Sequence, residues 1–145
     1  MLNFMKNLEP QCYALLRMVT GFLLLFHGTN YLLSWPVARG MENAVWYMAY
    51  LGMPILTFGG LFMCIGFFAR PAAFLASGMM AIAYWMYYGN KAFSPPADST
   101  NSFIELVLPI INKGELSVMF CFAALYVASR GSGIWSVDAA RGNSN

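Results

Sequence analysis

Charged side chains are scarce in this sequence of 145 residues. Asp, Glu, Lys and Arg make up 10% of it, whereas 59% of the residues are hydrophobic. A soluble domain carries about 25% charged residues, because its surface must be hydrated. The composition therefore excludes an ordinary soluble globular protein, and its hydrophobicity excludes a disordered chain. It predicts an integral membrane protein with room for about four spans.

Several kinds of functional motif are absent as well. The charges are scattered singly and sum to +2, so no basic run is present that would bind nucleic acid. The three cysteines lie far apart and the sequence has one histidine, which excludes a Cys/His metal cluster and bis-histidine haem ligation within one chain. No nucleophile elbow, phosphate-binding loop or HExxH motif occurs. We expect no metal site, no nucleic-acid partner and no self-contained hydrolase or kinase.

Charge-free intervals outline the membrane spans, since a charged side chain at the bilayer centre costs about 2.5–3.5 kcal/mol. We predict an all-α integral membrane protein, in which residues 1–145 form a single domain. Its four transmembrane helices form a bundle and lie at about residues 13–33, 44–69, 71–90 and 115–130. Each of the first three intervals holds about 20 residues, enough to cross a hydrocarbon core of about 30 Å.

Four spans place both termini on one side of the membrane. Basic residues are more numerous on that side than on the other, five against three: Lys6, Arg17, Arg70, Arg130 and Arg141 against Arg39, Lys91 and Lys113. The positive-inside rule therefore predicts cytoplasmic termini. We expect the first apolar stretch to be retained as a span, because no A-x-A-like cleavage site follows it.

Small residues recur at helical spacing in the second and third spans. A stripe of small side chains lets another helix approach closely, which is how membrane helices associate. We expect these residues to pack the bundle internally, with a docking face for another subunit as the alternative. The residues concerned are Gly59, Gly60, Ala69, Ala73, Ser77 and Ala81.

Two polar residues of the first span need an explanation, because ionisable groups inside spans are costly. Arg17 lies about one turn into the span, and we expect its side chain to extend to the cytoplasmic headgroups. His27 lies roughly 15 Å deeper. Its imidazole can tie helices together, hydrogen-bond a quinone carbonyl, bind a haem or relay protons. Asn30 and Tyr31 follow at one-turn spacing, so a polar patch is expected there.

The approach to the fourth span is irregular. A short half-helix is expected at 103–111, interrupted by Pro109 and followed by a break. Asn112 and Glu115 have the spacing of a capping box, with Asn112 as the N-cap and Glu115 reaching back to its amide. As an alternative, a buried Glu115 faces a ligand or pairs with His27. His27, Asn30, Asn112 and Glu115 are thus our candidates for a quinone or other polar intramembrane site.

Five stretches, in this order along the chain, resemble the signature of DoxX-like membrane proteins. They are Arg17-x-x-x-Gly21 leading to Phe-His-Gly at 26–28, Gly59-Gly60, the run GFFARPAA at 66–73, Pro109 with Asn-Lys-Gly-Glu at 112–115, and Gly-Ser-Gly at 131–133 with Ser-Val-Asp at 136–138. The resemblance implies a four-helix bundle of the bacterial inner membrane, often found with redox partners. Relatives include the small quinone-linked subunit of thiosulfate:quinone oxidoreductase.

Two departures from this family pattern bear on the chemistry. Members commonly carry an acidic residue just before the Gly-Gly pair, where this chain has Leu56, Thr57 and Phe58. They also tend to carry a lysine soon after His-Gly, where this chain has Thr29 and Asn30. Both departures favour a non-catalytic role.

Three functions are therefore expected, in decreasing order. The first is an accessory or structural subunit of a respiratory or other redox membrane complex that borders a quinone or lipid site. The second is a quinone-linked oxidoreductase subunit with its own quinone site, and the third is a small lipid or solute transporter. No motif binds a cofactor covalently, so quinone and structural lipids are the candidate ligands. Other membrane subunits are the expected partners.

Overall fold

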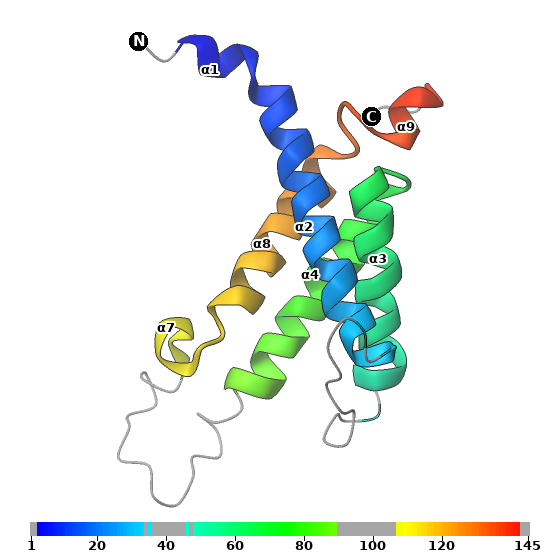
Figure 1. The fold of residues 1–145 in the computed structure, drawn as a ribbon. Coiled ribbons are helices and arrows are strands. Elements are labelled where there is room, and N and C mark those ends of the chain that lie inside the picture. Colours follow the sequence, from blue (N-terminus) through cyan, green and yellow to red (C-terminus); the bar gives the residue numbers. More distant parts are fainter. Residues whose placement is uncertain (1–2, 34, 36–45, 47, 90–106, 143–145) are drawn as a thin grey trace, which may run out of the picture.

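The computed structural model describes residues 3–33, 35, 46, 48–89 and 107–142. In this part of the chain every regular element is a helix and no strand occurs. Four longer helices lie side by side (Figure 1): α2 (Glu9–Leu32), α3 (Met53–Ile65), α4 (Ala69–Ala83) and α8 (Glu115–Arg130). The helix α2 packs mainly on α3, and α4 packs on both α3 and α8.

Two π-helical segments extend these helices. The segment η2 (Met48–Gly52) leads into α3, and η3 (Tyr84–Gly89) continues α4. Three short helices complete the described elements: α1 (Asn3–Asn7), α7 (Pro109–Asn112) and α9 (Val137–Ala140). Both termini lie at the same end of the molecule as the α3–α4 turn, and α7 lies at the opposite end (Figure 1). We call these the terminal end and the α7 end.

The helix bounds follow from local residues. α2 begins four residues before the predicted span, because Pro10 occupies its first turn, where a missing N–H costs nothing. α3 ends at Ile65 rather than at the predicted 69, because Gly66 follows with a φ of 69°, the left-handed conformation that terminates many helices. α4 begins at Ala69 rather than at the predicted 71, since Pro71 also fits a first turn. α8 has the predicted bounds. Residues 44, 45, 47 and 90 of the predicted spans lie outside the described residues.

The segment before α8 is interrupted at Leu108, which is extended between the helical Val107 and Pro109, and Pro109 opens the short helix α7 in its first turn. Residues 103–106 of the expected half-helix lie outside the described part, so the half-helix itself stays a prediction. The capping box at 112–115 is wrong, because Gly114 is the N-cap of α8 and no side chain caps it. Asn112 Oδ1 instead accepts from the Gly114 amide at 2.9 Å, and Lys113 has a φ of 63°.

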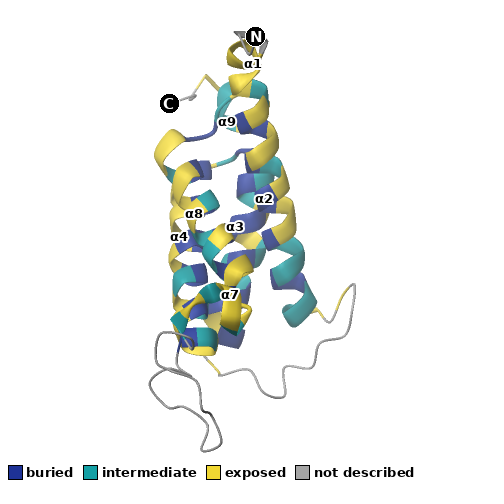
Figure 2. Ribbon diagram, turned by 90° about the vertical axis from the view of Figure 1, so that its left-hand side faces the viewer, coloured by how far each residue is buried: buried dark blue, intermediate teal, exposed yellow. Residues whose placement is uncertain are grey.

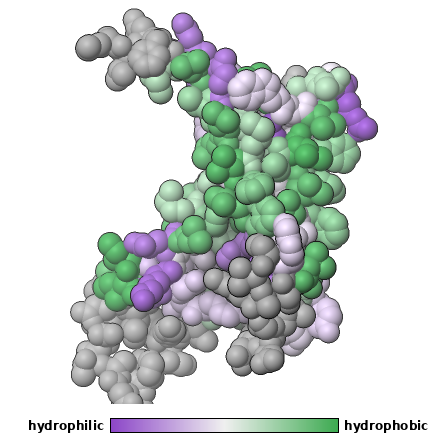
Figure 3. All heavy atoms as spheres, in the orientation of Figure 1, coloured by the Kyte–Doolittle hydropathy of each residue, from purple (hydrophilic) through white to green (hydrophobic). Residues whose placement is uncertain are grey.

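Apolar side chains occupy both the interior and much of the outer surface. The interior is filled by side chains such as Leu24, Met63, Met80 and Val127, which are at most 2% exposed, and buried positions face inward (Figure 2). The outer face carries large exposed hydrophobic residues, among them Phe22, Phe74 and Phe122. Figure 3 shows one face of the molecule, on which hydrophobic residues cover most of the middle and hydrophilic residues lie towards both ends; we call this middle zone the apolar belt.

Two stretches of the described chain are long and apolar enough to cross a membrane, Glu9–Leu32 and Met48–Ile65. The apolar belt would be unfavourable in water and suits a hydrocarbon environment. The all-helical fold class is therefore confirmed for the described residues.

Candidate functional site: a cavity at His27 and a clamp at Arg17

A cavity of about 220 Å³ lies between the four longer helices towards their α7 end. Each of α2, α3, α4 and α8 contributes to its wall, together with both π-helical segments. The polar members of the wall are His27, Tyr31, Tyr87, Tyr88 and Ser117, and the remainder are mainly methionine, leucine and alanine side chains. A mostly apolar wall with a few convergent polar groups is typical of a small-molecule site.

Both π-helical segments border this cavity. The segment η2 contributes Met48 and Gly52 to the wall, and η3 contributes Tyr87 and Tyr88. A π-helical turn changes which side chains face a neighbouring helix, and such turns occur frequently at functional sites. Here they bring two tyrosines, one methionine and one glycine to the same cavity.

His27 of α2 lines the cavity and is half-buried. Its ring packs edge-on to Tyr31, one turn further along α2, with centroids 6.0 Å apart. An imidazole nitrogen and a tyrosine or serine hydroxyl can each donate a hydrogen bond to a carbonyl oxygen. None of the described residues in the wall carries a carboxylate, and its described polar groups are an imidazole and hydroxyls.

The structure brings one of the four candidate polar residues to this cavity. Asn30 is half-buried but does not line it, and Glu115 is exposed on the first turn of α8. Asn112 lies beside Tyr84 instead, and its Nδ2 donates to the Tyr84 hydroxyl at 3.3 Å. The Tyr84 hydroxyl in turn donates to the carbonyl of Val107. Asn112 therefore fixes the α7 segment against the end of α4.

Sequence reasoning missed Ser117 as a member of the site. This residue is buried and follows Glu115 by two positions, on the face of α8 that points inward. Its signal in the sequence was weak, because a single serine in an apolar helix is common and its partners come from other helices.

Arg17 is fully buried, which corrects the expectation that it extends to the headgroups. Its Nη1 donates to the carbonyls of Met63 at 2.7 Å and Cys64 at 3.1 Å. Its Nη2 donates to the carbonyls of Trp135 at 2.8 Å and Ile134 at 3.3 Å. Arg17 thus connects the end of α3 to the segment after α8, and we call this arrangement the Arg17 clamp. The segment after α8 covers the guanidinium group, so the side chain does not extend to the surface.

Position 66, next to the Arg17 guanidinium group, has no space for a side chain larger than that of glycine. A Cβ atom at Gly66 would lie 2.5 Å from Arg17 Nη1 and 2.3 Å from Ser136 Cβ. The carbonyl of Gly66 accepts from the Asp138 amide at 3.1 Å. The family-like stretches at 66–73 and 131–138, distant in sequence, therefore meet at Arg17.

Asp138 adds a second connection at the terminal end. Its carboxylate accepts from Ser132 Oγ at 2.6 Å and from the amides of Phe68 and Ala69, where α4 begins. Desolvation raises the pKa of this carboxyl, but the hydrogen bonds from Ser132 and the two amides outweigh it, so its pKa is lowered. A residue after α8 thus supplies the N-terminal cap that α4 lacks locally.

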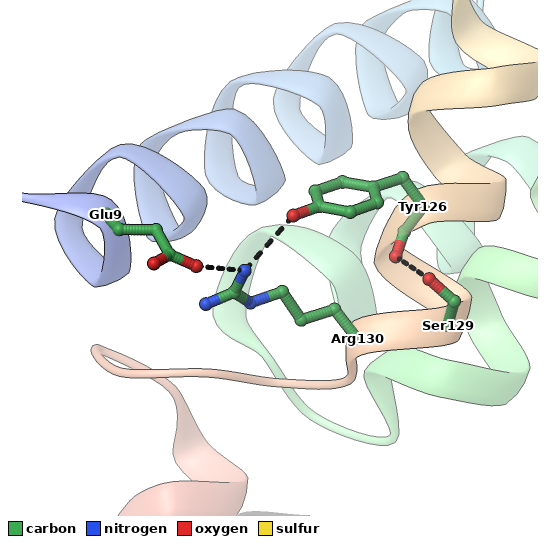
Figure 4. A network of polar contacts seen from close by, with 4 residues as sticks. All are labelled: Glu9, Tyr126, Ser129 and Arg130. Carbon is green, nitrogen blue, oxygen red and sulfur yellow. Dashed lines mark hydrogen bonds and ion pairs between the residues drawn. The ribbon is translucent and has the colours of Figure 1, made fainter. Parts of the chain in front are cut away.

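A further network at this end joins α2 to α8 (Figure 4). Arg130 Nη1 pairs with Glu9 Oε1 at 2.6 Å and donates to the Tyr126 hydroxyl at 3.1 Å. Ser129 Oγ donates to the Tyr126 carbonyl at 2.7 Å. Because the two charged side chains are 35% and 61% exposed, the pair contributes little stability.

The small residues occupy close helix contacts. Gly60 faces α2, where a Cβ would lie 2.4 Å from the Leu25 nitrogen, whereas Gly59 faces α4. On α4, Ala69, Ala73 and Ser77 are buried and Ala81 is half-buried. Ser77 Oγ donates to the carbonyl of Cys121 on α8 at 2.8 Å.

Comparison with known proteins identifies the family. The DoxX family model matches residues 12–89, a region that includes His27, Arg17 and most of the cavity wall. A Haemophilus influenzae protein described as uncharacterized is 30% identical over 145 residues, which cover 94% of this chain and 96% of that protein. No solved structure matches the chain significantly. The match confirms the resemblance of the sequence motifs: this chain belongs to the DoxX family of membrane proteins.

Proposed function

We propose that this protein is an accessory subunit of a respiratory or other redox complex and that its His27 cavity borders the quinone of that complex. In this proposal the four longer helices span the bacterial inner membrane, with both termini in the cytoplasm. The observation that supports it best is the cavity itself. It combines one imidazole and several hydroxyls with an apolar wall, and no carboxylate lines its described part.

The cavity fits the headgroup of a quinone in size and in polarity. An apolar cavity of about 150 Å³ is sufficient to bind benzene, and this one has about 220 Å³. One substituted ring therefore fills it. His27 and Ser117 would donate hydrogen bonds to the ring oxygens, while Met53 and Leu56 contact the ring face. A bound quinone would supply the redox chemistry, and this chain would position the ring and exclude water from it.

A second candidate, a quinone-linked oxidoreductase subunit with its own quinone site, uses the same cavity. It requires a group that accepts the proton when quinol is oxidised. Glu115, the carboxylate among our candidate residues for a polar intramembrane site, is exposed and does not line the cavity. The lining supports ligand positioning more directly than proton transfer, and we therefore favour the accessory role.

One pair of variants tests the role of the cavity. We expect His27→Ala to weaken quinone binding at least tenfold, because it removes a hydrogen bond and enlarges the cavity. Glu115→Gln serves as the control, since it changes a polar residue outside the wall. Quinone binding to the purified chain and quinone-linked turnover of the native membranes are the two measurements. Equal effects of the two variants, or no effect of either, would contradict a site at His27.

The accessory role has a separate test. The tagged chain is extracted from native membranes in a mild detergent, and co-migrating proteins are identified by mass spectrometry and by an optical spectrum. We expect a large complex with a redox absorbance, and deletion of the chain should reduce its assembly or turnover. Migration as a small colourless oligomer would overturn this role and favour the second candidate if quinone still binds.

A further inference from the structure

We propose that an anionic phospholipid binds on the outer face of α4 and α8 at the terminal end. Its headgroup would lie in a hollow between Arg70 and Arg141, and one acyl chain would follow the apolar groove between the two helices. This site is separate from the His27 cavity, which lies towards the α7 end. It does not depend on the function proposed above.

The hollow has about 300 Å³ and is lined by two arginines, Arg70 and Arg141, together with Ser132, Asp138 and Phe67. Both guanidinium groups are held by the fold. Arg70 Nη1 donates to the carbonyl of Ser129 at 3.2 Å, and the Arg141 guanidinium lies over the Phe67 ring, 5.1 Å from its centroid. Two held arginines at the edge of a hollow suit a phosphate group, which they can bind by several hydrogen bonds.

The charge of the hollow is positive despite Asp138. The charged residues of its described wall are two arginines and one aspartate, which sum to a formal charge of +1. A ligand with one negative charge would balance this charge. The carboxylate is already bound by Ser132 and by the amides of Phe68 and Ala69. It therefore fixes the start of α4 and remains part of the wall when a phosphate binds.

An apolar groove between α4 and α8 has a lining residue, Ser129, that contacts Arg70 of the hollow. It has about 580 Å³ and is lined by Phe74, Phe122, Leu125, Tyr126, Ala128 and Ser129. Arg70 connects the two, because it lines the hollow and donates to the carbonyl of Ser129, which lines the groove. Phe74 and Phe122 are 61% and 65% exposed, on adjacent helices within the apolar belt. A cationic hollow joined to an apolar groove matches an amphipathic ligand with one anionic head.

This pairing favours a lipid over a free anion. Each CH₂ of an acyl chain that is buried in the groove adds hydrophobic stabilisation, which a free phosphate lacks. Cationic side chains near an anionic leaflet add electrostatic attraction to its headgroups. The site also lies at one end of the apolar belt, where headgroups of a bilayer would meet the protein.

The test uses the full chain purified in mild detergent and measures bound lipid by native mass spectrometry. The probes are dioleoyl phosphatidylglycerol, dioleoyl phosphatidylcholine and inorganic phosphate. We expect phosphatidylglycerol to be retained at least fivefold more than phosphatidylcholine, and phosphate to give no retained adduct. Equal retention of both lipids would mean unspecific binding, and an adduct with phosphate alone would mean a simple anion site. Either outcome would overturn the proposal.

Charge-matched variants locate the lipid. Arg141→Gln should reduce retention of phosphatidylglycerol about fivefold, whereas Lys6→Gln removes the same charge from α1, outside the hollow, and should change it less than twofold. Arg70→Gln should act like Arg141→Gln. The melting temperature of each variant is measured in the absence of lipid, to detect misfolding. If the Arg70→Gln variant does not fold, the result for Arg141→Gln alone tests the proposal. Equal effects of Arg141→Gln and Lys6→Gln would contradict binding in the hollow.

Discussion

A buried cation is usually paired with a carboxylate, but the guanidinium group of Arg17 donates its hydrogen bonds to main-chain oxygens. Two of its acceptors, the carbonyls of Met63 and Cys64, belong to the last turn of α3. Carbonyls at the end of a helix lack intrahelical donors and carry partial negative charge. The other two acceptors lie in the segment after α8. The arginine therefore satisfies oxygens on two elements at once, and its charge is stabilised without an ion pair among the described residues.

We expect Arg17→Met to destabilise the protein by about 3 kcal/mol or more, since hydrogen bonds to a charged group contribute about 1.5–3 kcal/mol each. Arg17→Lys should also be destabilising, because an ammonium group cannot reach both sets of carbonyls with the planar geometry of a guanidinium. Thermal unfolding in detergent measures both changes. The control is Lys6→Gln, an exposed position where the effect should stay within about 0.5 kcal/mol. An Arg17→Met melting temperature equal to that of the control would show that the clamp contributes nothing.

Asp138 makes the terminal end sensitive to acid. Its pKa is lowered in the folded state, so the charged carboxylate stabilises the fold. This contribution is complete above the unfolded value of about 3.9 and is lost as the pH falls through the lowered pKa. We expect the segment after α8 to become more sensitive to protease as the pH is lowered from 5 towards 3. Asp138→Asn should show the sensitive state already at pH 7, whereas Glu115→Gln should behave as the unchanged protein.

At the level of whole elements, the crossing of α2 and α3 depends on glycine. Gly21 and Gly60 meet there, and a Cβ on either would lie within 2.7 Å of main-chain atoms of the other helix. Main-chain atoms cannot move aside as a flexible side chain can. In lipid the hydrophobic effect does not drive helices together, so van der Waals packing between closely spaced helices is a main source of their association.

A pair of adjacent glycines tests this contact. We expect Gly60→Ala to destabilise the protein by about 1–3 kcal/mol, the usual cost of overpacking, because its Cβ would lie 2.4 Å from the Leu25 nitrogen. Gly59→Ala is the matched control, since its Cβ would lie 3.4 Å from the Ala72 carbonyl oxygen, an ordinary contact. Thermal unfolding in detergent should separate the two. Similar melting temperatures would show that α2 and α3 can shift apart without cost.

For the molecule as a whole, the arrangement of its ends gives a prediction on membrane orientation. Both termini lie at one end and α7 at the other (Figure 1). The α7 end is therefore expected to face away from the cytoplasm if the positive-inside rule holds for this chain. The exposed residues Lys113 and Arg141 mark the two ends.

Cysteine labelling in whole cells tests this orientation. Cys12, Cys64 and Cys121 are first changed to serine, and Lys113→Cys or Arg141→Cys is then introduced. We expect an impermeant maleimide to label the Lys113→Cys variant in intact cells and the Arg141→Cys variant only after lysis. The reverse pattern would place the termini outside. Labelling of both variants in intact cells would contradict a fold with its two ends on opposite sides of a membrane.

The order of residues along the chain was sufficient to predict the apolar helices and to explain where several of them begin or end. Scarcity of charge defined the helices, and α8 has the predicted bounds because a charged residue stands at each end of its apolar run. Local chemistry also explains the Gly66 terminus of α3 and the start of α4 near Pro71. The helical spacing of the small residues Gly60, Ala73 and Ser77 predicted that these positions face a neighbouring helix. These features depend on neighbours in the chain, and sequence displays them directly.

Which polar groups meet depends on how the helices pack in three dimensions. Arg17 was expected at the headgroups, yet it is buried because residues 131–136 fold back over it. His27 and Ser117 lie on helices far apart in sequence and share one cavity, whereas Asn112 turns to Tyr84. A cap for α4 comes from Asp138, about 70 positions away. Such contacts depend on the packing angle and register of several helices, and local spacing carries no information on either.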